Sequence, residues 1–346
     1  MTASLQELLE LELPVIQAPM AGVQDSALAI AVSNAGGLGS LPCAMLSLEA
    51  LGAQLAAITA GCDKPYNVNF FCHTPPTPDE QREAAWRDEL SPYYAEYGID
   101  ASTIPPATRR DPFSAEALDV IREFKPPVVS FHFGLPAPDL LDGVRAMGAK
   151  VFSSATTVAE ARWLESRGVD AVIAQGVEAG GHRGMFLSTD ITGQVSTLAL
   201  LPQIVKAVNL PVIAAGGIAD ANGVSAVLAL GAAAAQIGTA YLLCGETTTS
   251  PVHRAALKDA GAVHTALTNR FSGRPARSIV NRVMHELGPL GQVPDFPLAA
   301  TAIGPLRSAA EARNLGDFSP LWSGQNPSGC REIPAAQLTR ELGRDQ

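Results

Sequence analysis

Short apolar runs of strand length recur along the first two thirds of the chain, with helix-like stretches between them. Continuous apolar strands that alternate with helices are typical of a parallel sheet covered on both faces. Eight such runs over roughly 240 residues predict an α/β fold, a closed (β/α)8 TIM barrel, with an open doubly wound sheet as the alternative. The expected strands are residues 14–18, 36–41, 66–71, 127–131, 149–153, 170–174, 211–215 and 233–238.

The alternation of apolar runs and helix-like stretches is interrupted in two places. Residues 73–113 are rich in proline, charge and tyrosine and are too long for a simple βα loop, so they are expected to contain an excursion with a helix. After Cys244 the strand pattern stops. We therefore predict a barrel over residues 1–243, a small, mostly helical cap at its mouth over 244–306, and a C-terminal segment, 307–346, that returns to the barrel.

Composition excludes several classes of function. The net charge is −10, and the sequence has no cluster of Lys and Arg that could bind phosphates. Both observations argue against nucleic acid or an anionic membrane as a partner. Five scattered cysteines match no zinc spacing and indicate reduced thiols and no metal site. Glycine and glutamine interrupt the apolar stretch 228–244, which predicts a buried strand and no membrane span. We expect a cytoplasmic protein that acts on a small molecule, with a homodimer as the candidate assembly.

The most informative motif is Gln175-Gly-Val-Glu-Ala-Gly-Gly-His-Arg-Gly184, directly after the sixth apolar run. Its glycines let the backbone approach a flat or phosphorylated ligand. His182 stands among them, and imidazole is the side chain whose pKa lies nearest neutral pH. Two interpretations stay open, a catalytic acid or base and a structural histidine that caps a turn.

Two further glycine pairs follow the seventh and eighth strands. Ligands of parallel barrels bind at the C-terminal ends of the strands, and these two loops often hold a phosphate. Gly216 and Gly217 can present N–H groups to an anion, and Gly238 and Thr239 add another N–H and a hydroxyl. Either pair alone could simply turn the chain, but together they favour a cofactor that carries a phosphate.

Absent motifs narrow the choice of cofactor. No GxGxxG unit, P-loop, HExxH or GxSxG elbow is present, so FMN fits what remains. The amides of Asn69 and Gln175 could bond the polar edge of the flavin ring, and the main chain of Met20 could border it.

One histidine and three arginines have competing interpretations. His132 ends the fourth strand between two phenylalanines and is either a core histidine or a contact to substrate. Arg183 is expected to be solvated or ion-paired. Arg274 and Arg277 are expected to fasten the cap to the barrel.

The chain resembles the nitronate monooxygenase family, formerly called 2-nitropropane dioxygenases, over almost its whole length. The motifs that carry the resemblance are Gln17-Ala-Pro-Met-Ala-Gly22, Ala31-Val-Ser-Asn-Ala-Gly-Gly-Leu-Gly39, residues 67–71 and 130–134, Gly180-Gly-His-Arg-Gly184, Ala215-Gly-Gly-Ile218, Gln236-Ile-Gly-Thr239 and Ser272-Gly-Arg-Pro-Ala-Arg277.

The resemblance implies a mechanism as well as a fold. His182 would remove the proton α to the nitro group of a nitroalkane, and the nitronate would be oxidised by O2 to a carbonyl compound and nitrite. The resemblance also implies non-covalent FMN bound at Met20, Asn69, Gln175, Gly180, Gly217, Gln236, Gly238 and Thr239.

Three other functions stay open. FMN-dependent relatives that share the Gly-Gly-His motif reduce enoyl thioesters or quinones with NAD(P)H. A flavin-free barrel lyase or isomerase that acts on a phosphorylated substrate would use the same glycine loops. A flavin-binding module without catalysis is the fourth hypothesis.

Overall fold

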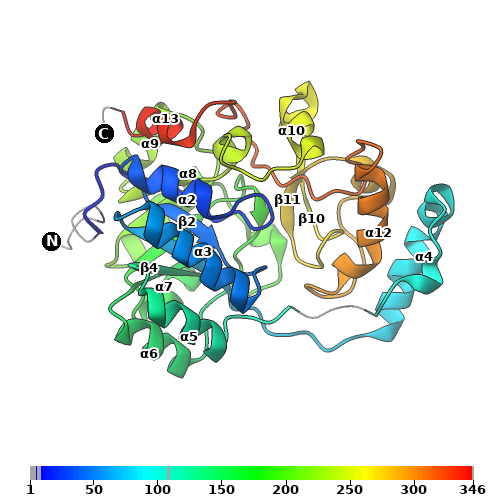
Figure 1. The fold of residues 1–346 in the computed structure, drawn as a ribbon, viewed down its shortest axis with the longest axis horizontal. Helices are drawn as coiled ribbons and strands as arrows, with labels where there is room; N and C mark the ends of the chain where they lie inside the picture. The colour runs from blue at the N-terminus through cyan, green and yellow to red at the C-terminus, as the bar shows by residue number, and fades with distance from the viewer. Residues whose placement is uncertain (1–4, 6–8, 107–109, 345–346) are drawn as a thin grey trace.

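Eight parallel strands form the barrel that the apolar runs predict (Figure 1). The computed structural model describes residue 5, residues 9–106 and residues 110–344. Main-chain hydrogen bonds of 2.9 Å join Leu38, just before β2, to Val15 and Gln17 of β1, so the sheet closes on itself. The strands are β1 Val15–Gln17, β2 Gly39–Pro42, β3 Tyr66–Phe71, β4 Val128–His132, β5 Lys150–Ala155, β6 Ala171–Gln175, β8 Val212–Ala215 and β9 Ala234–Ile237.

Helices surround the barrel and bury the outer face of the strands. Several begin at a residue whose side chain accepts a hydrogen bond from the first turn, such as Ser47 before α3, Thr157 before α7 and Ser196 before α8. The barrel helices are α2 Ser26–Asn34, α3 Leu48–Gly61, α5 Ala115–Phe124, α6 Pro138–Ala146, α7 Val158–Glu165, α8 Thr197–Ala207 and α9 Ala221–Ala229. Short 3₁₀ helices lie at Ala101–Thr103, Ile191–Gly193, Thr239–Leu243 and Ala260–Val263.

The cap contains a small antiparallel sheet of β10 Thr265–Thr268, β11 Ala276–Ile279 and β7 Gly181–His182. The expectation that strands stop after Cys244 is therefore wrong. The reason is that β11 gains its second neighbour from the loop after β6, where Ala276 pairs with His182. A four-residue strand with so distant a partner has no local apolar pattern to reveal it.

Helix α4, Glu80–Tyr97, belongs to the hydrophobic core of the cap and lies beside α12, Ala299–Glu311 (Figure 1). The indole of Trp86 donates to the carbonyl of Ala299 at 3.1 Å, and the Tyr94 hydroxyl donates to Ala302 at 2.7 Å. The cap thus takes in part of residues 73–113 in addition to 244–306. Its other helices are α10 Pro251–Lys258 and α11 Arg282–Leu287.

The C-terminal segment runs back from the cap to the barrel. Helix α13, Ala335–Leu342, packs near α2 and α9 at the opposite end of the molecule from α4 (Figure 1). The hydroxyls of Thr339 and Tyr241 lie 2.9 Å apart in a buried hydrogen bond that fixes this return. Within the described residues, no helix has the length and apolar character needed to span a bilayer.

Candidate active site

A cavity of about 320 Å³ opens at the C-terminal ends of the strands, between the barrel and the cap. Every residue that the sequence analysis selects for the site lines this one cavity. These residues are Met20, Asn69, His132, Gln175, Gly180, His182, Gly216, Gly217, Gln236, Gly238 and Thr239. The topology brings them together because they lie in the C-terminal half of, or just after, β1, β3, β4, β6, β8 and β9 of the same closed sheet.

The loops after β8 and β9 form a glycine cradle, which we define as Gly216, Gly217, Gly238 and Thr239. Gly216 and Gly217 have φ of 122° and 75°, a region that other residues rarely adopt, so the turn itself requires glycine. Gly238 precedes the 3₁₀ helix that begins at Thr239. The cradle offers main-chain groups and one hydroxyl without a bulky side chain, which suits a phosphate.

The tail covers the cradle, a feature that sequence reasoning missed. The N–H of Gly324 donates to the Thr239 hydroxyl at 2.9 Å, and the Asn326 amide donates to the Gly217 carbonyl at 3.1 Å. A side chain at Gly180 would lie 2.6 Å from the Gly324 nitrogen, so tail and loop pack without space between them. The small residues that follow Trp322 are the only local signal of this close approach.

The three amides that the sequence predicts for the cavity differ in their hydrogen bonds. Gln175 uses both ends of its side chain on the protein, donating to the His182 carbonyl at 3.0 Å and accepting from the Gly184 N–H at 2.7 Å. Asn69 donates to the Ser130 hydroxyl at 2.9 Å. The Gln236 amide has no partner among the described residues and is available to a ligand. Gln175 therefore holds the histidine loop in place in addition to lining the cavity.

His182 lies on β7, at the junction of barrel and cap. Its Nε2 lies 2.8 Å from the Ser272 hydroxyl, while Nδ1 has no hydrogen-bond partner among the described residues. The rings of Phe296 and Trp322 pack against it with centroids 5.3 and 5.4 Å away. The imidazole is thus fixed at one nitrogen and enclosed by apolar surface.

Burial, together with the nearby positive charges of His132, Arg274 and Arg110, lowers the pKa of His182 to about 3. An imidazole in this environment is neutral at neutral pH. A neutral imidazole can accept a proton, so the site can perform base chemistry.

His132 is engaged by the protein at both ring nitrogens. Its Nε2 lies 3.2 Å from the His182 carbonyl and its Nδ1 lies 3.0 Å from the Ser154 hydroxyl. Because a carbonyl only accepts, Nε2 donates and Nδ1 accepts from Ser154. Burial lowers the pKa of His132 to about 4. These bonds give His132 a structural task, and a contact with substrate stays a prediction.

Arg183 is completely buried, and the expectation that it is solvated or ion-paired is wrong. Its guanidinium donates to the carbonyls of Gln175 and Gly176 at 2.7 Å and to the Gln194 side chain at 2.9 Å. The loop after β6 leaves these carbonyls without sheet partners, and one arginine provides the donors that burial requires.

Arg274 and Arg277 join the cap to the barrel, as their place in the Ser-Gly-Arg-Pro-Ala-Arg motif predicts. Arg274 donates to the carbonyl of Met185, and Arg277 donates to the carbonyl of Val177 at 2.8 Å. Both acceptors belong to the segment around the histidine motif, so these arginines hold the cap against the His182 strand.

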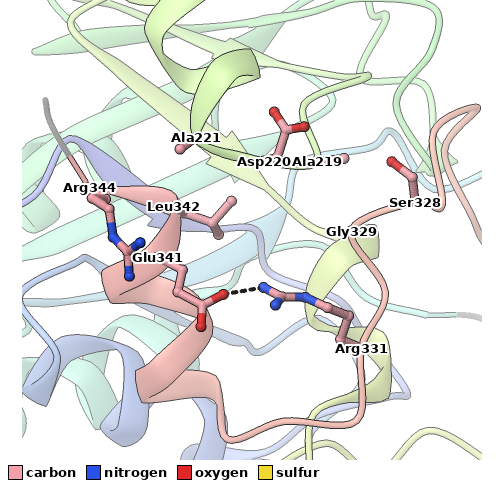
Figure 2. A pocket seen from close by; sticks show the side chains of 9 residues that line it. All are labelled: Ala219, Asp220, Ala221, Ser328, Gly329, Arg331, Glu341, Leu342 and Arg344. Atoms are coloured by element: carbon pink, nitrogen blue, oxygen red, sulfur yellow. Dashed lines mark hydrogen bonds and ion pairs between the residues drawn. The ribbon is translucent and has the colours of Figure 1, made fainter.

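A second hollow, of about 480 Å³, lies between the start of α9 and the end of α13 (Figure 2). Its charged lining includes an ion pair in which Arg331 and Glu341 approach to 2.5 Å. None of the candidate residues lines this hollow, and the charges of Arg331 and Glu341 neutralise each other. The cavity around His182 is therefore the candidate active site.

The fold and the cavity define a barrel protein with a cavity over glycine-rich strand ends. The family model described as nitronate monooxygenase matches residues 2–345, and the chain belongs to this family of flavin-dependent oxidoreductases.

Relatives and solved structures agree with this assignment. The chain is 43% identical to a nitronate monooxygenase of Pseudomonas aeruginosa, over 99% of this chain and 98% of the relative. A crystal structure of nitroalkane oxidase from Streptomyces ansochromogenes matches with a TM-score of 0.89 and 39% identity, covering 98% of this chain and 96% of that one. FabK from Thermotoga maritima matches with a TM-score of 0.71 and 28% identity, covering 99% and 95%.

Proposed function

We propose that the protein binds FMN and oxidises alkyl nitronates, and nitroalkanes after deprotonation, with O2 to carbonyl compounds and nitrite. The observation that carries the proposal is the position of His182, a neutral buried imidazole in the same cavity as the glycine cradle. A proton acceptor thereby lies beside a place for a phosphorylated cofactor.

The residues present fit FMN. The cradle at Gly216, Gly217, Gly238 and Thr239 would hold the phosphate, and the Gln236 amide and the Met20 segment would face the ring system. FMN, when bound, supplies the electron transfer between substrate and O2 that side chains alone cannot perform.

His182 is proposed as the base that removes the proton α to the nitro group. Ser272 and the β7–β11 pairing keep its ring in one position, so the imidazole is preorganised for proton transfer. Nearby Arg274 and Arg110 add positive charge, which stabilises negative charge as it develops on the nitro oxygens. An anionic nitronate needs no base, so its oxidation depends on His182 less.

An NAD(P)H-dependent reductase of enoyl thioesters or quinones is the second candidate, because the Gly-Gly-His motif at residues 180–182 is compatible with both reactions. A homodimer and a cytoplasmic location remain predictions of the sequence. Light scattering of the purified protein tests the homodimer.

Anaerobic mixing of the flavin-loaded protein with ethylnitronate or NADH tests the proposed function. We expect ethylnitronate to change the visible flavin spectrum promptly, and NADH to leave it unchanged. Prompt bleaching by NADH alone would transfer the assignment to the reductase. A purified protein without flavin absorbance, and unable to take up FMN, would leave only the flavin-free hypotheses.

A further inference from the structure

Arg110 lines the cavity from the segment between α4 and α5, and no motif in the sequence points to it. Its main-chain carbonyl accepts a hydrogen bond of 2.9 Å from Nε2 of His73, a buried histidine. Its guanidinium carbon lies 6.0 Å from the ring centre of Phe296, which is also the ring that packs against His182. Arg110 therefore belongs to the part of the cavity that contains the imidazole.

Within the described part of the chain, the guanidinium of Arg110 has no partner of opposite charge. Among the described residues, no carboxylate lies within ion-pair distance and no carbonyl accepts a hydrogen bond from it. Burial lowers the pKa of its side chain. The five N–H donors of this half-buried guanidinium are therefore left for water or for a ligand that enters the cavity.

The other arginines around His182 have partners on the protein. Arg183 is enclosed by carbonyls, Arg274 is bonded to Met185 and stacked 4.1 Å above the Phe133 ring, and Arg277 is bonded to Val177. The positive charges of Arg274 and Arg110 lower the pKa of His182, and those of Arg274 and Arg183 lower the pKa of His132, so positive charge acts on this part of the cavity within a protein of net charge −10. An anionic ligand is attracted to such a site, and Arg110 is the arginine with donors to spare.

We propose that Arg110 is a specificity-determining residue that binds the two oxygens of an anionic nitronate through its planar guanidinium. A planar anion with two oxygens matches the fork of arginine donors better than the point charge of lysine. The apolar rings of Phe296 and Phe71 would exclude water from this contact and leave the adjacent carbon facing His182. The inference rests on the proposed function, because the nitronate is its substrate.

Substitution of Arg110 distinguishes binding of the anion from binding of the neutral molecule. In Arg110→Met we expect KM for ethylnitronate to rise about tenfold to a hundredfold, because a charge-assisted hydrogen bond is lost. For neutral nitroethane we expect KM to change little and kcat to fall, since charge develops only in the transition state. Arg110→Lys should restore part of both losses. Equal KM values for ethylnitronate in Arg110→Met and the wild type would overturn the proposal.

A binding experiment separates this inference from the proposed function. Sodium nitrate, a planar inert anion, is titrated into the flavin-loaded wild type, Arg110→Met and the matched control Arg122→Met by calorimetry. Arg122 lies on α5, pairs with Asp119 and is exposed. We expect nitrate to bind the wild type and Arg122→Met equally and Arg110→Met at least tenfold more weakly, a loss of about one charge-assisted bond.

Each outcome has a definite meaning. Nitrate that fails to bind the wild type, or that binds Arg110→Met unchanged, would refute the anion site. Nitrate binding that depends on Arg110, in a protein that oxidises no nitronate, would retain the anion site and reject the proposed function. Flavin absorbance and far-UV circular dichroism of Arg110→Met verify that the variant is folded and loaded.

Discussion

The two walls of the cavity are built by different means. The barrel wall consists of the strand ends, where Gly216, Gly217 and Gly238 offer main chain and the amides of Asn69 and Gln236 offer neutral donors and acceptors. The cap wall consists of side chains, with aromatic rings and arginine charges around His182. The barrel wall thus offers the main-chain groups that the proposed cofactor needs, whereas the cap wall offers the positive charge that the proposed anionic substrate needs.

His182 lies where the two walls meet. Its strand β7 leaves the barrel after β6 and pairs with β11 of the cap, and its carbonyl is held by Gln175 and His132 of the barrel. The imidazole therefore depends on both halves being assembled. Changes to either wall should therefore affect the site, and turnover, FMN affinity and stability are the quantities that report them.

The largest effect is expected for His182→Asn. The amide has similar size and polarity but cannot act as a base, so we expect turnover of neutral nitroethane to fall about 10²–10⁴-fold. Oxidation of ethylnitronate, which arrives already deprotonated, should be largely retained. Steady-state oxygen consumption with each substrate measures both. A similar loss on the two substrates would refute a base role and indicate a structural one.

Gly180→Ala is expected to damage the barrel wall alone. The added carbon would meet the main chain of Gly324 at 2.6 Å and push the tail away from Thr239. We expect the dissociation constant for FMN to rise about tenfold, roughly the loss of one hydrogen bond. Flavin fluorescence during dilution measures it. The control is Gly245→Ala, where a new carbon meets nothing within 4 Å; if both variants bind FMN equally, the tail does not support the cradle.

The last effect concerns stability instead of turnover or binding, and it depends on pH. Burial lowers the pKa of His253 in the cap and of His132 in the barrel to about 4 in the folded protein. Between about pH 4 and 6.5 the unfolded chain then binds more protons than the folded protein. The free energy of unfolding therefore has its highest value above pH 6.5 and decreases as the pH falls towards 4. Each histidine should contribute about 1.4 kcal/mol per pH unit in that window.

Urea unfolding between pH 5 and 7 measures this slope in the wild type, His253→Gln and His132→Gln. Glutamine keeps a donor for the Trp322 carbonyl that His253 bonds at 3.1 Å. We expect each variant to have a shallower slope than the wild type. A slope that changes in only one variant would show that the two walls bury their histidines differently.

The sequence by itself determined the barrel and the positions of its ligand-facing residues. Strands buried on both faces need continuous apolar runs, so they can be recognised locally, and residues at their C-terminal ends meet at one mouth. For that reason the sequence predicts Gly217, Gln236 and His182 in one cavity. The strands after Cys244 cannot be predicted in this way, because β10 and β11 are too short to show a period.

The composition of the cap wall and the covering of the cradle by the tail become visible only in the folded protein. Arg110 reaches the cavity from the segment between two helices, the tail meets Gly180 across more than a third of the sequence, and Arg183 is buried instead of solvated. Each of these depends on neighbours far away along the chain, and local composition carries no record of such neighbours. The physical reason is that burial and unpaired charge are properties of the folded surface, whereas strand pattern is a property of the chain.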